Sequence, residues 1–218
     1  MKKKKFRICS FLLLCSLCFF ININSVNAFF NINNNISKLN YIIIIGDSRM
    51  YLIENKREEL NIPDSIIFIA KNGANIEFLE NEALFKAKNL IKNKNINYHI
   101  IFNLGVNDLN YDIDYKKRAN EYVNIYKKFI KNNKSASYYF LSVNPIDEDI
   151  INDLWDNIRT NKKIKNFNRI VASKTHNIMN YCDSYSSLKF NLPDGLHYDT
   201  TTDINIMNYI LNDCVKFN

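Results

Sequence analysis

The sequence predicts an α/β fold in which helices cover both faces of a parallel β-sheet. Three observations lead to this prediction: apolar runs alternate with helical patterns, most of the runs are apolar without interruption, and three of the four glycines closely follow a run. Continuous apolar runs are typical of strands that are buried on both faces of a parallel sheet. The alternation of strands with helices is typical of the βαβ units that build such sheets.

Five strands are expected, each from one apolar run. We expect them at residues 41–45, 66–70, 99–102, 137–143 and 178–182. β-Branched and aromatic residues, which favour strands, dominate the first four runs. Gly46, Gly73 and Gly105 follow the first three runs, and Pro145 stops the fourth. Because ligands bind outside the carboxyl ends of the strands in open α/β sheets, these glycines mark one edge of the sheet as the candidate site.

Helices are expected in the intervals between the runs and after the last one. We expect them at residues 50–60, 76–92, 119–129, 150–172 and 204–215. In each segment, apolar residues recur at about the spacing of one helical face. Tyr122, Tyr126 and Phe129 share one such face, and we expect this stripe to pack in the core rather than to bind a sugar.

Length and charge limit the classes of protein that fit. A chain of 218 residues with 47% hydrophobic and 23% charged residues has the size and composition of one globular domain. Five of its 29 basic residues lie in the first seven positions, and the remaining 24 basic residues are nearly balanced by 22 acidic ones. The rest of the chain is nearly neutral, which argues against nucleic acid as a partner.

The N-terminal segment predicts export. Residues 1–28 combine a basic start, an apolar stretch at 8–23 and small residues before position 28, as a secretory signal peptide does. An uncleaved anchor is the alternative, although the stretch is at the short end of the roughly 20 residues that span a bilayer. We expect residues 29–40 to form a short mobile lead-in and the mature chain to have no membrane span. The expected location is secreted or cell surface.

Two cysteines, Cys182 and Cys214, lie outside the signal segment. In an oxidising compartment they could form a disulfide, but two buried thiols are equally compatible with the sequence. The distance between their Cα atoms decides between these alternatives.

Polar residues beside the glycines indicate nucleophilic catalysis. Ser48 follows Gly46 at the end of a buried strand and enters a helix, which would place its hydroxyl at the sheet edge. A serine needs a base, for which His197 is the candidate, and Asp194 lies three residues before it, where a turn would bring its carboxylate to the imidazole. The backbone N–H groups of Ser48 and Gly73 and the side-chain amide of Asn107 are the candidate donors to an oxyanion.

Each candidate also has a purely structural interpretation. Ser48 after Gly-Asp could be a helix N-cap, His197 could be a surface histidine in a turn, and Asn107 could be a turn former at a strand end. The competing histidines are His99, expected to be packed within a strand, and His176, expected to be solvated at the end of a helix.

Four segments in chain order resemble the blocks of the SGNH (GDSL-type) hydrolase superfamily: Gly46-Asp47-Ser48, Gly73, residues 105–108 and residues 194–197. The resemblance spans residues 41 to about 200, and we interpret residues 41–218 as an SGNH hydrolase domain. It implies a flavodoxin-like three-layer α/β/α sandwich with a five-stranded parallel sheet, and neither a metal nor an organic cofactor. It assigns the nucleophile, the triad and the oxyanion donors to the candidates named above.

Two further residues are candidates for the substrate cleft. Arg49 stands where the family often has leucine, and it could contact an anionic substrate, although a place on the helix surface is the simpler interpretation. Asn144 lies in a segment, residues 142–145, that resembles a substrate-side loop of some secreted family members.

The sequence therefore predicts a monomeric, secreted serine esterase acting on a small-molecule or glycan ester, such as a carbohydrate O-acetyl group. The alternatives are an O-acyltransferase or a lipid acyl hydrolase that uses the same site. A third alternative is a catalytically idle cell-surface binding module on the same fold.

Overall fold

The computed structural model describes residues 40–93, 95–110, 114–154 and 158–217. The predicted signal peptide at residues 1–28 lies outside the described residues, and so does all but the last residue of the predicted lead-in. Both therefore stay predictions. Within the described ranges, no helix is long and apolar enough to cross a membrane.

Five parallel strands form one sheet in the order β2-β1-β3-β4-β5. They are β1 (Asn40–Gly46), β2 (Ile66–Ala70), β3 (Asn97–Asn103), β4 (Ala136–Leu141) and β5 (Asn180–Cys182). In the register, Ile44 of β1 pairs with Phe68 on one side and with Ile101 on the other. The predicted five-stranded parallel sheet is confirmed, and the strand order is that of the flavodoxin-like fold.

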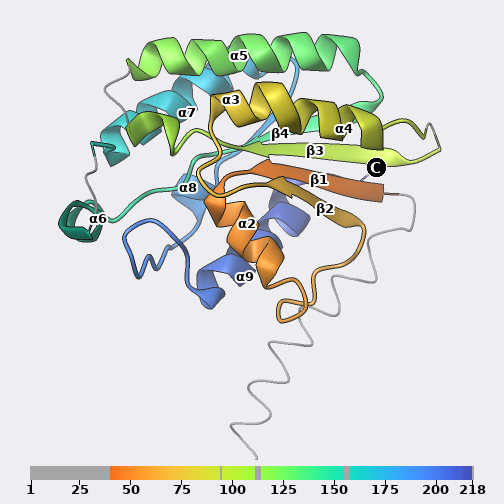
Figure 1. Ribbon diagram of the computed structural model, residues 1–218. Coiled ribbons are helices and arrows are strands. Elements are labelled where there is room, and N and C mark those ends of the chain that lie inside the picture. Colours follow the sequence, from red (N-terminus) through yellow and green to blue (C-terminus); the bar gives the residue numbers. More distant parts are fainter. Residues whose placement is uncertain (1–39, 94, 111–113, 155–157, 218) are drawn as a thin grey trace, which may run out of the picture. The chain divides into compact units, whose positions relative to one another are not determined.

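Helices lie on both faces of this sheet (Figure 1), which confirms the predicted three layers. One face carries α3 (Ile76–Phe78), α4 (Leu84–Leu90), α5 (Tyr115–Asn132) and α7 (Asn161–Thr175), and the other carries α2 (Ser48–Asn55) and α9 (Thr200–Tyr209). The shorter segments are η1 (Leu79–Ala83), η2 (Asp108–Asn110), α6 (Glu148–Leu154), α8 (Ser184–Ser187) and η3 (Ile210–Cys214).

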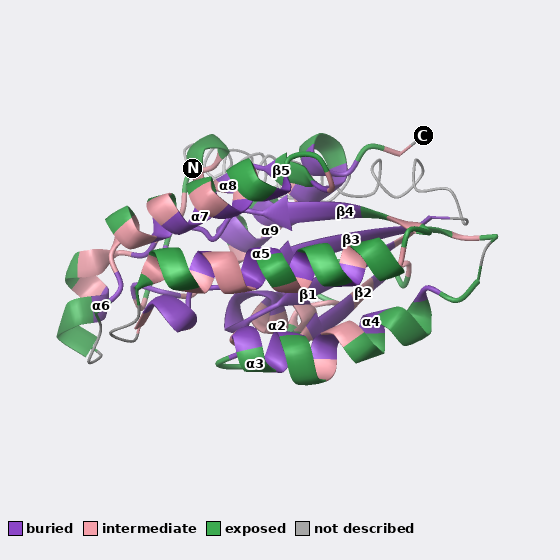
Figure 2. Cartoon of the chain, turned by 90° about the horizontal axis from the view of Figure 1, so that it is seen from above, coloured by how far each residue is buried: buried purple, intermediate pink, exposed green. Residues whose placement is uncertain are grey.

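The core forms on both faces of β1. Its four consecutive isoleucines, Ile42 to Ile45, are fully buried. Ile43 and Ile45 belong to the core on the side of α3, α4, α5 and α7, so the alternating side chains fill the opposite face. Burying an isoleucine side chain contributes roughly 1.5–3 kcal/mol, so this run alone is a substantial stabilising element. Figure 2 shows the strands buried between helices whose outer sides are exposed.

The aromatic stripe of α5 lies in the core, as predicted. Tyr122 and Tyr126 are fully buried and Phe129 is nearly so. The ring of Tyr126 lies 4.4 Å from that of Phe102, and the ring of Tyr122 meets Phe167 of α7 edge to face. This packing leaves these rings no surface on which a sugar could stack.

The prediction of one helix at residues 150–172 is wrong. The structure has two helices there, α6 and α7, with residues 155–157 between them outside the described ranges. α7 has its own N-cap, because the hydroxyl of Thr160 accepts a hydrogen bond from the N–H of Lys163. Leu154, one of the apolar residues within the predicted helix, is 61% exposed.

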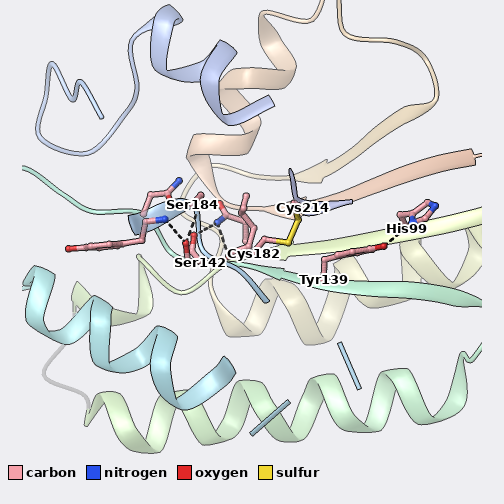
Figure 3. The surroundings of a disulfide bond; sticks show 10 residues. His99, Tyr139, Ser142, Cys182, Ser184 and Cys214 are labelled. Atoms are coloured by element: carbon pink, nitrogen blue, oxygen red, sulfur yellow. Dashed lines mark hydrogen bonds between the residues drawn. A yellow bond between two sulfur atoms is a disulfide. The ribbon is translucent and has the colours of Figure 1, made fainter. Parts of the chain in front are cut away.

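A disulfide joins Cys182 at the end of β5 to Cys214 in η3, with the Cα atoms 5.2 Å apart. The structure thus selects the disulfide from the two alternatives that the sequence left open. Figure 3 shows the bond beside the side chains that follow β4 and β5. It closes a segment of the chain that contains both Asp194 and His197, and closing a loop of such length typically contributes about 2–4 kcal/mol.

Candidate active site

The candidate residues gather at the carboxyl edge of the sheet, where the strand order reverses. The connection from β1 leads to β2 on one side, and the connection from β3 leads to β4 on the other, so the direction reverses between β1 and β3. Such a switch point is where open α/β sheets bind ligands. Ser48 follows β1, Gly73 follows β2, and Asn107 follows β3. The sheet thus delivers three of the predicted residues to one edge from three different strands.

The turn from β1 into α2 fixes the position of Ser48. A side chain at Gly46 would place its Cβ 2.4 Å from the Cβ of Met50, so the close approach of strand and helix requires glycine there. Asp47 is the N-cap of α2, since its carboxylate accepts a hydrogen bond of 3.0 Å from the N–H of Arg49. Ser48 is the first helical residue rather than the cap, so its hydroxyl is not used for capping.

A chain of hydrogen bonds connects the serine to an imidazole and a carboxylate. The Oγ of Ser48 lies 3.0 Å from Nε2 of His197, and Nδ1 of His197 lies 2.7 Å from Oδ2 of Asp194. The other carboxylate oxygen of Asp194 accepts from the N–H groups of Leu196 and His197. Residues that are 149 positions apart in the sequence therefore meet at hydrogen-bond distance.

The carboxylate determines which nitrogen of His197 carries the proton. Burial opposes the ionisation of Asp194, but the hydrogen bonds from the side chain and backbone of His197 and from Leu196 outweigh it, and the pKa of Asp194 is lowered. An ionised carboxylate can only accept, so Nδ1 of His197 donates and Nε2 is left as an acceptor for the hydroxyl of Ser48. This tautomer is the one that a general base for Ser48 needs.

The loop that carries His197 rests on the start of α6. Gly195 has φ of +79°, and an added Cβ would lie 2.6 Å from the backbone nitrogen of Ile151. Its carbonyl accepts a hydrogen bond of 2.9 Å from the N–H of Asp147. Glycine is therefore required at position 195 both for the left-handed backbone and for the close contact with α6.

The two other candidate oxyanion donors belong to neighbouring loops that are bonded to each other. The side-chain amide of Asn107 donates to the carbonyl of Ala74 at 2.9 Å, and Gly73 precedes Ala74 in an exposed stretch of the loop after β2. The amide nitrogen of Asn107 has a second N–H, which this bond does not use. Their role as oxyanion donors stays a prediction.

Asp108 holds these two loops together, and sequence reasoning gave it no definite role. It is 2% exposed, and its carboxylate accepts from the hydroxyl of Tyr122 at 2.6 Å and from the N–H of Ile76 at 3.3 Å. Burial raises the pKa of Asp108, opposed by these hydrogen bonds and by Arg118, which lies 3.5 Å away. Its place directly after Asn107 was the only available signal.

The structure does not support either candidate for the substrate cleft. Arg49 is 1% exposed, and its guanidinium donates to the backbone carbonyls of Leu196, Asn144 and Pro145. Asn144 is fully buried, with its amide donating to the hydroxyl of Tyr198. Both side chains are used up by internal contacts, so neither faces a substrate, and Arg49 does not lie on the helix surface either.

The competing histidines lie away from Ser48, as expected. His99 is 5% exposed inside β3, which confirms its packed position, and His176 is exposed, with Nδ1 donating to the carbonyl of Ser173 at 2.8 Å. Within the described part of the chain, no three histidine, cysteine, aspartate or glutamate side chains are grouped so that they could hold a metal ion.

Comparison with known proteins relates this fold to solved structures. No family model and no curated protein matches the sequence. A carbohydrate acetylesterase from Sinorhizobium meliloti superimposes with a TM-score of 0.61, at 12% identity over 79% of this chain and 97% of its own. A GDSL-like lipase from Bacteroides thetaiotaomicron gives 0.57, at 15% identity over 85% of this chain and 93% of its own.

A protein from Streptococcus pneumoniae superimposes with a TM-score of 0.64, at 17% identity over 91% of this chain and 96% of its own. The likeness to these three structures extends over most of both chains in each pair. The chain therefore has the fold found in GDSL-type hydrolases. At such identities the likeness concerns the fold, and what the protein does has to be argued from its own residues.

Proposed function

We propose that the protein is a serine esterase that hydrolyses a carboxylic ester through an acyl-enzyme on Ser48. One observation carries the proposal: the continuous hydrogen-bond chain from Ser48 to His197 and on to Asp194, with distances of 3.0 and 2.7 Å. This arrangement has the order and the spacing of a Ser-His-Asp triad, which is identified by geometry rather than by sequence position. The fold that the chain shares with esterases and lipases supports the same conclusion.

In the first half of the reaction, the Oγ of Ser48 attacks the carbonyl carbon of the ester while Nε2 of His197 takes the hydroxyl proton. The resulting imidazolium is stabilised by the carboxylate of Asp194. The negative charge that develops on the carbonyl oxygen is stabilised by hydrogen bonds that the N–H groups of Ser48 and Gly73 and the amide of Asn107 donate to it. His197 then gives its proton to the leaving alkoxide, and an acyl-serine remains.

In the second half, water repeats the same steps on the acyl-serine. His197 takes a proton from the water, whose oxygen attacks the acyl carbon. The tetrahedral intermediate collapses, the Oγ of Ser48 leaves and recovers the proton, and the carboxylic acid is released. A sugar hydroxyl in place of water would make the same site a transferase.

For the substrate we propose a short acyl group on a carbohydrate or similar alcohol, released outside the cell. The acetylesterase from Sinorhizobium meliloti supports the acyl group and the carbohydrate, because it has the same fold. The basic and apolar N-terminal segment supports export. We expect the protein to act as a monomer.

A fluorophosphonate probe and p-nitrophenyl esters of increasing chain length test the proposal. We expect the probe to label Ser48, as located by mass spectrometry, and acetate to be hydrolysed faster than octanoate. In Ser48→Ala, we expect hydrolysis to fall by about 10⁴-fold or more while the circular dichroism stays unchanged. Faster turnover of octanoate would favour a lipid acyl hydrolase, and acyl transfer to an added sugar would favour a transferase. A folded protein that neither reacts with the probe nor turns over any ester would contradict the proposal.

A further inference from the structure

Arg49, next to the candidate nucleophile, is an unusual residue for its position. Arg49 is the second residue of α2, and a charged side chain in the first turn of a helix normally points to water. The side chain of Arg49 instead is 1% exposed, and its guanidinium lies 5.2 Å from the centre of the Tyr198 ring. A buried charge of this kind persists only where hydrogen bonds replace its hydration.

Three backbone carbonyls replace that hydration. Nε donates to the carbonyl of Leu196 at 3.0 Å, Nη1 to that of Asn144 at 2.9 Å, and Nη2 to that of Pro145 at 2.8 Å. Leu196 immediately precedes His197, and Asn144 and Pro145 belong to the loop after β4. Arg49, which follows Ser48, is therefore hydrogen-bonded to the backbone of Leu196, which precedes His197.

A second set of contacts fixes the other side of His197. Tyr198 follows it, and the hydroxyl of Tyr198 accepts a hydrogen bond of 3.0 Å from the amide of Asn144. The amide oxygen of Asn144 accepts in turn from the hydroxyl of Ser184 at 2.6 Å. Burial raises the pKa of Tyr198 to about 12, so its hydroxyl stays protonated over the pH range in which an esterase works.

We propose that Arg49 is a positioning residue, which holds the loop of His197 at the distance from Ser48 that proton transfer requires. This inference rests on the proposed function and deepens it, since Arg49 touches neither substrate nor the reacting atoms. Hydrogen bonds from a charged donor are stronger than neutral ones, and the planar guanidinium reaches three acceptors in two loops at once. Without it, the loop of His197 keeps its bonds to Asp194 and the contact between His197 and Ser48, but its backbone loses the hydrogen bond from Arg49 that ties it to α2.

Arg57 offers a matched control within the same chain. It lies just beyond the C-terminal end of α2, where its guanidinium donates to the carbonyls of Ile62, Pro63 and Ile66. It also lies over an aromatic ring, that of Phe68, at 5.6 Å. Arg57 thus makes the same kinds of contact as Arg49, but it holds the loop before β2 and nothing at the carboxyl edge of the sheet.

The kinetic test compares Arg49→Met with Arg57→Met, using p-nitrophenyl acetate as substrate. We expect Arg49→Met to lower kcat by about 10²-fold, because a misplacement of about 1 Å in a catalytic group has an effect of that size. Its KM should change by less than about threefold, since substrate binding is not removed. Arg57→Met should lose thermal stability while its kcat stays within about threefold of the unmodified protein. In Arg49→Lys, the ammonium can keep part of the contacts, and we expect kcat between those of Arg49→Met and the unmodified protein.

Hydrogen exchange of the peptide that covers residues 192–198 gives a readout that does not depend on activity. We expect its backbone N–H groups to exchange faster in Arg49→Met than in the unmodified protein, but not in Arg57→Met. If Arg49→Met does not fold, Arg49→Lys takes its place in this comparison, and the same faster exchange is expected. The inference would be overturned if residues 192–198 exchanged at the same rate in Arg49→Met and Arg57→Met, or if the kcat of Arg49→Met were unchanged. If the unmodified protein hydrolyses no ester, the proposed function fails, while the exchange experiment still decides whether Arg49 holds this loop.

Discussion

Of the three Asp-Ser pairs in the chain, two directly follow a strand and begin a helix, and only one of these lies in the candidate site. Asp47-Ser48 follows β1 and Asp183-Ser184 follows β5, and in both pairs the serine is the first residue of a helix. In both, the aspartate is the N-cap and accepts a hydrogen bond from a backbone N–H in the first turn. Both serines thus begin a helix directly after an aspartate cap, although the backbone of the two caps differs, with ψ of −158° at Asp47 and 66° at Asp183.

The hydroxyl groups of the two serines have different partners. Ser48 meets Nε2 of His197, whereas Ser184 donates to the amide oxygen of Asn144 and lies 3.0 Å from the hydroxyl of Ser142 (Figure 3). An imidazole can take a proton near neutral pH, but an amide oxygen cannot. The local sequence thus builds the position of the serine, and a loop from far along the chain decides whether it can act as a nucleophile.

The largest expected effect comes from removing His197, the partner of Ser48, because only Ser48 depends on this imidazole for its reactivity. In His197→Ala, we expect kcat for p-nitrophenyl acetate to fall by about 10⁴-fold and fluorophosphonate labelling of Ser48 to disappear, because the base is gone. In Ser184→Ala, we expect Ser48 still to be labelled and kcat to fall by less than about tenfold. Loss of labelling in a folded Ser184→Ala variant would contradict this comparison, because it would show that the reactivity of Ser48 also depends on Ser184.

A smaller effect should come from Asn107, the candidate oxyanion donor on the loop after β3. If its amide stabilises the oxyanion, Asn107→Ala lowers kcat by about 10²–10³-fold with little change in KM. Asn133→Ala is the control, since the amide of Asn133 also donates to a backbone carbonyl, that of Phe129 at 2.8 Å, and is also half-buried. Similar kcat values in the two variants would limit Asn107 to a structural role.

The smallest effect concerns a third pair, the imidazole of His99 and the hydroxyl of Tyr139, which lie 3.2 Å apart nearer the amino ends of the strands (Figure 3). Burial lowers the pKa of His99 below its ordinary value of about 6.5, so the folded protein binds a proton there less readily than the unfolded chain. Its contribution to stability is therefore complete above that pH and is lost as the pH falls towards the lowered pKa.

We expect His99→Gln to make the free energy of unfolding less dependent on pH between about 5 and 7 while kcat stays the same. Urea unfolding at several pH values measures this. An unchanged slope would show that His99 does not titrate differently on folding, and a large loss of kcat would mean that this pair takes part in the reaction.

The sequence was sufficient where a signal is local or where several segments agree. The isoleucine run of β1 predicted a strand buried on both faces, and three glycine-marked strand ends together with Asp194 and His197 predicted residues that the structure brings to one edge. Arg49 was beyond reach, because its partners are backbone carbonyls 95 to 147 residues away, and a carbonyl leaves no trace in the residue type. Asn144 was interpreted as a cleft residue from the resemblance of residues 142–145 to a substrate-side loop, whereas its amide is bonded inside the protein to the hydroxyls of Tyr198 and Ser184.

The disulfide between Cys182 and Cys214 has a consequence for a chain exposed to proteases. The stretch that it closes, residues 183–213, contains Asp194 and His197, whereas Ser48 lies outside it. A single peptide-bond cut within this stretch leaves both fragments covalently attached, so the acid and the base are not released from the body that holds the nucleophile. Only a second cut, or reduction of the bridge, would set them free.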